Sequence, residues 1–368
     1  MTRKRLTRRD FMKDSAVVAA GAAVVAGAAQ AGAAKADEDV KKTRSYNPEM
    51  EYRRLGKTGL WVSAVSLGGH WKRIDKVLDV PGRVNGWAPP KSSPVADAFH
   101  KNRYETLTRC IERGINLVDA CSGPEIMAYA HALRGRREKM FLCFSWYEKE
   151  PRFPGWRTKA KLLQGLDEGL RDAKLEYADL WRISAHIRGS QHTTAEEEAI
   201  AEALAEARKA GKVRFTGISS HDRPWLRKMI ETYPDAIQAV LTPYTANSKE
   251  LPEDSLFDAV RKHDVGVLGI KPFASNSLFK GDGSPGSPHA AEDDRRARLA
   301  LRYILCNPAI TAPIPGLISN QQVENAVAAV KERRTLDSRE TAELEAASRQ
   351  MWANLPQGYQ WLKEWEYV

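Results

Sequence analysis

The chain has 368 residues, with 57 Lys and Arg against 47 Asp and Glu, and a formal net charge of +10. Seven of these basic residues and two of the acidic ones lie in residues 1–36, so the remainder carries 50 against 45, or +5. Opposite charges are interleaved along most of that remainder, which is typical of an ordinary solvated surface rather than a nucleic-acid footprint. We therefore predict no nucleic-acid partner.

Residues 1–36 have the pattern of a twin-arginine export signal. The pair Arg8-Arg9 is followed by an apolar residue and a lysine, and then by an Ala-, Gly- and Val-rich stretch at 15–34. A retained membrane anchor is the alternative, because about 20 residues can span a bilayer. Alanine and glycine insert weakly, however, and the stretch has no Leu or Ile. Candidate cleavage sites follow Ala31 and Ala36.

This signal predicts where the protein works. Twin-arginine export carries folded proteins, so we expect folding in a bacterial cytoplasm, passage through the twin-arginine machinery, and activity in the periplasm or outside the cell. We expect no stable membrane span in the mature form.

The four cysteines show no CxxC or Cys/His ligand spacing, so we predict no metal site. Each lies in an apolar context, which favours buried free thiols over disulfides even in an oxidising compartment. They are Cys110, Cys121, Cys143 and Cys306.

From residue 60 onward, short apolar runs alternate with longer segments of helical period. The predicted strands are 65–67, 116–119, 140–145, 178–184, 213–219, 237–241, 265–270 and 310–314. The predicted helices are 104–113, 125–133, 158–173, 195–210, 224–231, 254–263, 295–306 and 321–332. Eight such units favour an α/β fold of the (β/α)8 TIM barrel type, forming one domain over residues 37–368. In these barrels the chemistry lies where strands end.

Two connections are longer than a minimal barrel requires. Residues 69–102 have little periodicity, and Trp71, Trp87 and Phe99 supply apolar anchors, so we interpret them as a lid or substrate-facing loop. Residues 276–294 contain a literal GxGxxG at 281–286. Prolines at 285 and 288 prevent these glycines from opening a helix, so we discount a dinucleotide fingerprint.

Five blocks of the chain, in order, resemble the aldo/keto reductase superfamily, whose fold is this barrel. They include the run SLGG within the first block and GIKP within the fourth. Each block is weak alone, but the ordered set is specific. The blocks are residues 60–69, 114–119, 211–221, 266–272 and 300–325.

The resemblance implies a nicotinamide dinucleotide, NADP or NAD, bound across the strand ends. It places Ser219 and Ser220 near the carboxamide, Tyr244 on the nicotinamide ring, and Lys271 on the cofactor side or in a structural role. The family often has Tyr-Asn where this chain has Tyr244-Thr245. The adenosine phosphate is expected at a helix start, where unpaired N–H groups attract anions. The residues implied there are Gly316, Ser319, Gln322 and Asn325.

Catalysis in the family uses a tyrosine acid, a lysine and an aspartate that tune it, and a histidine that orients the carbonyl. Here Asp119 is at the aspartate position, but the tyrosine that should follow is missing. Ser145 stands at the lysine position and Ser184 at the histidine position. Reduction of a carbonyl needs a proton donor, and His186 is our best substitute, with Tyr147 second.

Three functions stay open at this point. The first is an oxidoreductase acting on a carbonyl or sugar-like substrate through non-standard acid/base residues, with NADP or NAD held tightly because no dinucleotide pool exists outside the cytoplasm. The second is a catalytically degenerate barrel that acts as a binding protein. The third is non-redox chemistry, by paired carboxylates or by a Schiff base on Lys271.

Overall fold

The computed structural model describes residues 38–78, 80, 88–186, 188–248 and 255–364. The predicted export signal and Trp87 lie outside these residues. The chain divides into two compact units, residues 1–43 and Arg44–Val368. The described part of the first unit is a single helical turn at 38–41 and the residues after it. No helix in the described ranges is long and apolar enough to cross a membrane.

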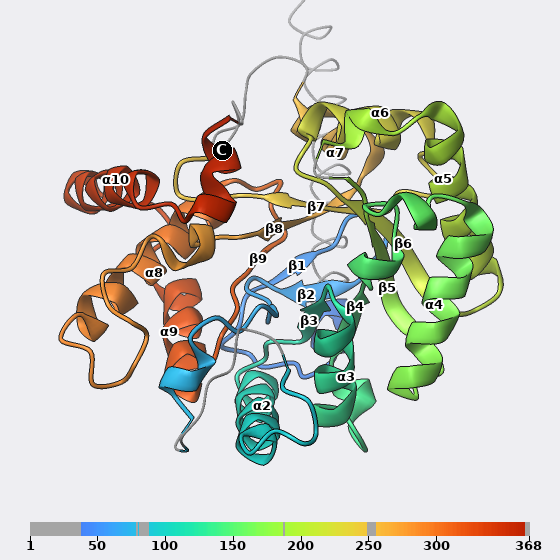
Figure 1. The fold of residues 1–368 in the computed structure, drawn as a ribbon. Coiled ribbons are helices and arrows are strands. Elements are labelled where there is room, and N and C mark those ends of the chain that lie inside the picture. The colour runs from blue at the N-terminus through green and yellow to red at the C-terminus, as the bar shows by residue number, and fades with distance from the viewer. Residues whose placement is uncertain (1–37, 79, 81–87, 187, 249–254, 365–368) are drawn as a thin grey trace, which may run out of the picture. The chain divides into compact units, whose positions relative to one another are not determined.

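The second unit is built on a seven-stranded parallel sheet in which each strand pairs with the next along the chain (Figure 1). Two of the strands, β5 and β6, have the predicted bounds, and the others begin or end within two residues of them. In order they are β3 Leu117–Ala120, β4 Phe141–Phe144, β5 Ala178–Ser184, β6 Val213–Ser219, β7 Ala239–Pro243, β8 Gly266–Ile270 and β9 Ala312–Ile314.

Residues 66–68 take the eighth position and close the sheet into a barrel. On one side the Leu67 N–H donates to the Leu117 carbonyl at 3.0 Å, and the Asp119 N–H donates to the Leu67 carbonyl at 2.9 Å. On the other side the N–H groups of Ser66 and Gly68 donate to carbonyls of the β9 segment at 3.0 and 2.8 Å. The predicted (β/α)8 barrel is therefore confirmed, with its first strand reduced to a short bridging segment.

A two-stranded antiparallel hairpin, β1 Tyr52–Arg54 and β2 Trp61–Ser63, fills the end of the barrel where strands begin. Leu55 and Leu60 pack in the same apolar cluster as Leu180 and Leu268 of the barrel strands. The turn needs glycine at position 56, because φ is +47° and a Cβ would lie 2.3 Å from the Gly266 nitrogen. The sequence analysis did not predict this hairpin. Since this end is filled, any cavity must open at the other end.

Eight helices surround the sheet, each following its strand (Figure 1). α3 begins with a Ser122 cap and a proline in its first turn, and α9 begins with a Ser319 cap. α2 begins at Ala96, so the long first connection is shorter than predicted. The helices are α2 Ala96–Glu112, α3 Gly123–Ala132, α4 Lys159–Ala173, α5 Thr194–Lys209, α6 Arg223–Thr232, α7 Leu256–His263, α8 Ala290–Cys306 and α9 Asn320–Lys331.

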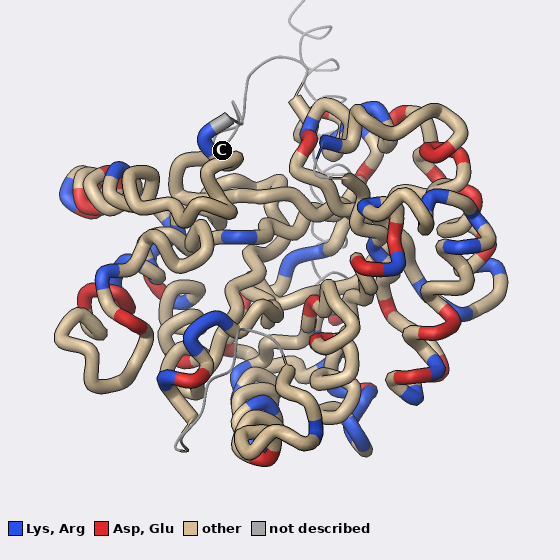
Figure 2. The backbone as a smooth tube through the Cα atoms, viewed as in Figure 1, with Lys and Arg blue, Asp and Glu red and all other residues tan. Residues whose placement is uncertain are grey.

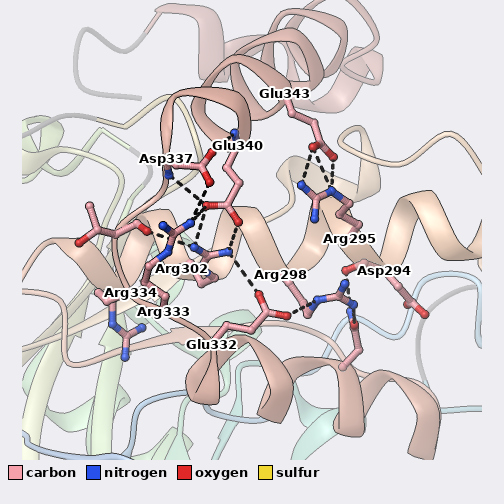
Figure 3. Close-up of polar contacts among 12 residues, drawn as sticks. Asp294, Arg295, Arg298, Arg302, Glu332, Arg333, Arg334, Asp337, Glu340 and Glu343 are labelled. Atoms are coloured by element: carbon pink, nitrogen blue, oxygen red, sulfur yellow. Dashed lines mark hydrogen bonds and ion pairs between the residues drawn. The ribbon is translucent and has the colours of Figure 1, made fainter.

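A further helix, α10 Ser338–Ala353, packs on α8 and was not predicted. Leu344 and Met351 join an apolar cluster with Leu299 of α8. Beside that cluster, buried Arg302 of α8 donates to both Glu340 oxygens at 2.8 and 3.0 Å (Figure 3). After α10 the chain forms the 3-10 segment Gln357–Glu364, which returns toward the barrel.

Basic and acidic residues are interspersed over the surface seen in Figure 2. The four cysteines are all free. Cys110 and Cys143 are buried as predicted, whereas Cys121 is half-buried and Cys306 is exposed, because it lies at the solvent end of α8.

Candidate functional site

A cavity of about 520 Å³ lies at the ends of the barrel strands. Strand-end residues line its floor, the start of α9 lines one wall, and the segment carrying Tyr359 lines the mouth. Nine residues that the sequence analysis named for the site line it, namely Asp119, Tyr147, Ser184, Ser219, Lys271, Gly316, Ser319, Gln322 and Asn325.

An ion pair between Asp119 and Arg182 forms part of the cavity floor. Side chains alternate across a strand, so Asp119 shares the inner face of β3 with Leu117, and Arg182 shares that of β5 with Leu180. The Arg182 Nε and Nη2 donate to Asp119 at 2.9 to 3.0 Å, and the two side chains are only 3% and 7% exposed. Burial lowers the pKa of Arg182, but the negative charge of Asp119 outweighs it and raises the pKa, so the guanidinium stays charged.

A chain of hydrogen bonds continues behind this pair. Arg182 Nη1 donates to Ser184 Oγ at 2.8 Å, and Ser184 Oγ lies 2.9 Å from Ser145 Oγ. Ser145 donates in turn to Glu150, which also accepts the Ser184 N–H at 2.7 Å. Burial raises the pKa of Glu150. Ser145 itself is fully buried behind the floor, so it is placed to orient Ser184 rather than to touch a ligand.

Besides Ser145, three predicted site residues lie away from the cavity lining. His186 turns back on its own loop, where its Nδ1 accepts the Arg188 N–H at 3.1 Å. Ser220 donates to the His186 carbonyl at 3.0 Å. Tyr244 is 4% exposed, and its hydroxyl accepts a hydrogen bond from Asn307 at 3.1 Å.

The cavity mouth joins two lysines and an aromatic ring from three distant segments. Lys72 Nζ donates to Ser275 Oγ and lies 4.4 Å from the centre of the Tyr359 ring. Lys271 Nζ lies 5.5 Å from the same centre. Burial raises the pKa of Tyr359, but the charges of Lys271 and Lys72 outweigh it and lower the pKa to about 8.

The wall at α9 is fixed by cap hydrogen bonds and by close packing of backbone on backbone. Ser319 Oγ accepts the Gln322 N–H at 3.2 Å, and Gln322 Oε1 accepts the Ile318 N–H at 3.0 Å. A Cβ on Gly316 would lie 2.5 Å from the Gly69 carbonyl oxygen. Asn325 is held from the far side by Arg298 of α8, which pairs with Glu332 (Figure 3).

A group of three side chains stands beside the floor, where the missing tyrosine was expected. His70 and Cys121 line the cavity, and Glu125 is buried behind them.

The aldo/keto reductase family profile matches residues 97–297, more than half of the chain. The protein belongs to the aldo/keto reductase family. It is 25% identical over 327 residues to L-galactose dehydrogenase of Arabidopsis thaliana, covering 81% of this chain and 94% of that protein. It is 27% identical over 276 residues to L-glyceraldehyde 3-phosphate reductase of Escherichia coli O157:H7, covering 68% and 70%.

Solved structures of the family share the fold. An aldo-keto reductase from Klebsiella pneumoniae in complex with NADPH superimposes with a TM-score of 0.60 at 20% identity, over 81% of this chain and 94% of that one. An aldo-keto reductase of Bacillus halodurans in its holo form gives 0.57 at 22% identity, over 81% and 96%. At these sequence identities the similarity shows only that the barrel fold is shared.

Sequence reasoning missed Arg182, His70, Glu125 and Tyr359. Arg182 had a usable signal, because a charged residue in line with Leu180 on an apolar strand must face the barrel interior. His70 and Tyr359 had none, because loop conformation places them. Trp71, predicted as an apolar anchor of the long first connection, is fully buried and contacts Phe99 and Tyr129.

We expect Asp119→Ala to lower the free energy of unfolding by about 3–5 kcal/mol, because it leaves the Arg182 charge buried without a partner. Adding Arg182→Met should recover much of this loss. Urea denaturation followed by circular dichroism measures both. The control is Asp258→Ala, which removes an exposed ion pair and should cost less than about 1 kcal/mol. Equal losses for Asp119→Ala and Asp258→Ala would contradict the assignment.

Proposed function

We propose that the protein is an exported oxidoreductase that transfers hydride between tightly held NADP or NAD and a carbonyl or sugar-like substrate. Family membership supports the reaction type. The observation that carries the proposal is a single cavity that joins the buried Asp119–Arg182 pair to Ser219 and to the start of α9.

The cavity fits a dinucleotide by its shape and its charges. Lys72, Arg73 and Lys271 line it and offer positive charge to a pyrophosphate. The first turn of α9 offers N–H groups and the positive end of a helix dipole, which attract phosphate. When bound, the nicotinamide would supply or accept the hydride. The NADPH complex of the Klebsiella structure supports NADP as the first candidate.

Arg182 supplies the cation that Ser145, at the family's lysine position, cannot. The hydrogen bonds from Arg182 to both Asp119 oxygens fix the guanidinium and direct Arg182 Nη1 to Ser184. Ser184 is thereby oriented at the cavity floor, where it can hydrogen-bond a substrate oxygen. A guanidinium this basic does not release a proton, so a separate proton donor is required.

We assign that role to Tyr359 rather than to His186, which lies away from the cavity lining, or to Tyr147, which lines the cavity but has its pKa raised by burial. Tyr359 lines the cavity, and two lysines hold its phenol near the pKa that proton transfer at neutral pH favours. In carbonyl reduction the phenol gives its proton to the oxygen as hydride reaches the carbon. Bulk water then restores the phenol proton.

Export adds a constraint on the reaction cycle. Residues 1–36 carry the twin-arginine pattern, and outside the cytoplasm a dinucleotide has no pool with which to exchange. A cofactor loaded before export must then be reduced by one substrate and reoxidised by another. The two relatives are named for a sugar dehydrogenase and a sugar-phosphate reductase, which supports polyhydroxylated carbonyls as substrates.

Protein purified after folding in the cytoplasm should release NADP or NAD when it is denatured, as detected by absorbance and mass spectrometry. We expect close to one dinucleotide per chain. Stripped protein should quench and blue-shift NADPH fluorescence on titration. Absence of both signals would overturn the proposal and favour the binding-protein alternative.

Tyr359→Phe should lower kcat for carbonyl reduction by about 10²-fold or more, the usual contribution of a general acid, and leave NADPH affinity unchanged. The wild-type rate should fall as the pH rises through about 8, because the phenol loses the proton that it must donate. This inflection should vanish in the variant. The matched control is Tyr104→Phe at an exposed site on α2. A loss confined to cofactor affinity would show that Tyr359 only binds cofactor.

The double substitution Arg8→Lys and Arg9→Lys should retain the precursor in the cytoplasm, because the twin-arginine route requires the pair. Cell fractionation and immunoblotting measure this. Arg3→Lys with Arg5→Lys makes the same two substitutions outside the pair and should be exported normally. Export of the Arg8, Arg9 variant would refute the signal.

A further inference from the structure

We infer a binding site for a divalent transition metal, best suited to zinc, formed by His70, Cys121 and Glu125. These residues lie beside the cavity floor, and their donor atoms all lie within 4.8 Å of one another. His70 follows the barrel-closing segment, Cys121 follows β3, and Glu125 lies in the first turn of α3. The inference goes beyond the proposed function and does not depend on it.

The spacing of the donor atoms suits a tetrahedral ion. His70 Nδ1 lies 3.4 Å from Cys121 Sγ and 2.9 Å from Glu125 Oε1. Around zinc, with bonds of about 2.3 Å to sulfur and 2.0–2.1 Å to nitrogen and oxygen, a nitrogen lies about 3.5 Å from a sulfur and about 3.3 Å from an oxygen. The two distances from His70 Nδ1 are therefore close to those around a zinc ion, and the sulfur-to-oxygen distance is at most 4.8 Å.

The geometry also distinguishes a metal site from a catalytic proton relay. In a catalytic proton relay, one ring nitrogen of the histidine contacts the nucleophile and the other contacts the carboxylate. Here both the thiol and the carboxylate approach Nδ1. One ring nitrogen carries at most one proton, so it cannot serve as donor to one partner and acceptor from the other. Three donors that converge on one point are instead the arrangement that a cation requires.

The surrounding backbone is built to hold these ligands. His70 adopts a left-handed conformation, φ +54°, which is uncommon for a residue with a side chain and is found where surrounding contacts enforce it. The N–H groups of His70 and Cys121 donate to the two oxygens of Glu125 at 2.5 and 2.7 Å. Hydrogen bonds of this kind orient ligating carboxylates. A Cβ on Gly69 would lie 2.1 Å from the Glu125 carboxyl carbon, so glycine is required beside it.

The types of the three ligands favour zinc, and their exposure to the cavity indicates where a fourth ligand would bind. One imidazole, one thiolate and one carboxylate suit zinc, and three protein ligands leave the fourth position for water or substrate, as in catalytic zinc sites. His70 and Cys121 line the cavity while Glu125 is buried, so a fourth ligand would arrive from the cavity side. An ion here could polarise an oxygen of a molecule bound over the floor.

The sequence analysis expected no metal because no Cys/His spacing along the chain matched a known site. His70 and Cys121 are separated by 51 positions, and only barrel closure brings them together. The residues therefore form a site in space that has no counterpart as a linear motif.

The test uses the full mature chain, freed of metal with a chelator and titrated with Co²⁺ alone. We expect one equivalent to bind and to produce the thiolate-to-cobalt charge-transfer absorption, and zinc to displace it. Cys121→Ser should abolish that absorption, and His70→Ala should weaken Co²⁺ binding by more than about tenfold. The control is Cys306→Ser, an exposed cysteine at a distance in the sequence, which should behave as wild type.

Two results would overturn the inference. The first is a wild-type chain that binds no stoichiometric Co²⁺ or binds it without the charge-transfer absorption, a measurement that needs no variant to fold. The second is an absorption that persists in Cys121→Ser, which would assign it to another thiol. The cobalt absorption does not depend on enzyme activity. The metal site can therefore be tested even if the protein is not an oxidoreductase.

Discussion

A full positive charge buried inside an apolar barrel is the interaction around which the site is organised. Arg182 is tolerated there because Asp119 accepts it with both oxygens, since an uncompensated buried charge costs several kcal/mol. The remaining guanidinium nitrogen needs its own acceptor and finds Ser184. Ser184, Ser145 and Glu150 then form one connected polar layer beneath the cavity. Satisfying one charge thus fixes the position of four other side chains.

This arrangement explains how the residues that differ from the family's pattern can still form a coherent site. A serine at the lysine position and a serine at the histidine position would leave Asp119 without a cation. Arg182, two residues before Ser184 on the same face of β5, supplies the cation that Asp119 would otherwise lack. The positive charge is kept, but it can no longer tune a nearby phenol by giving up a proton. We propose that the acid/base chemistry comes instead from the mouth of the cavity, where Lys72 and Lys271 flank Tyr359.

Most of the barrel was predictable from sequence because parallel strands are buried on both faces and appear as apolar runs. β5 and β6 matched residue for residue for this reason. The hairpin β1–β2 escaped prediction because its strands have three residues each, too few to show a period. Helix α10 follows the last barrel unit, where no fold-level expectation existed. The packing of α10 on α8 includes the ion pair between Arg302 and Glu340, which no local sequence pattern predicts.

The site was predictable where it lies on strands and helix starts, and not where it lies on loops. The family resemblance pointed to Asp119, Ser184, Ser219 and the α9 residues, which lie on strands or near a helix start and line the cavity. His70 depends on a left-handed backbone angle that the surrounding contacts enforce. Tyr359 depends on a segment that returns to the barrel after α10. Such positions follow from tertiary packing, which a single sequence does not display.

The short closing segment at 66–68 has a consequence for folding and solubility. It joins β3 to β9, and its hydrogen bonds to Pro313 and Pro315 link residues about 247 positions apart. Contacts this distant along the chain form late, because the entropy of closing so long a loop must first be overcome. Until then β3 and β9 present unpaired strand edges that can associate with another chain. The same few residues that complete the barrel therefore also protect a partly folded chain from aggregation once they dock.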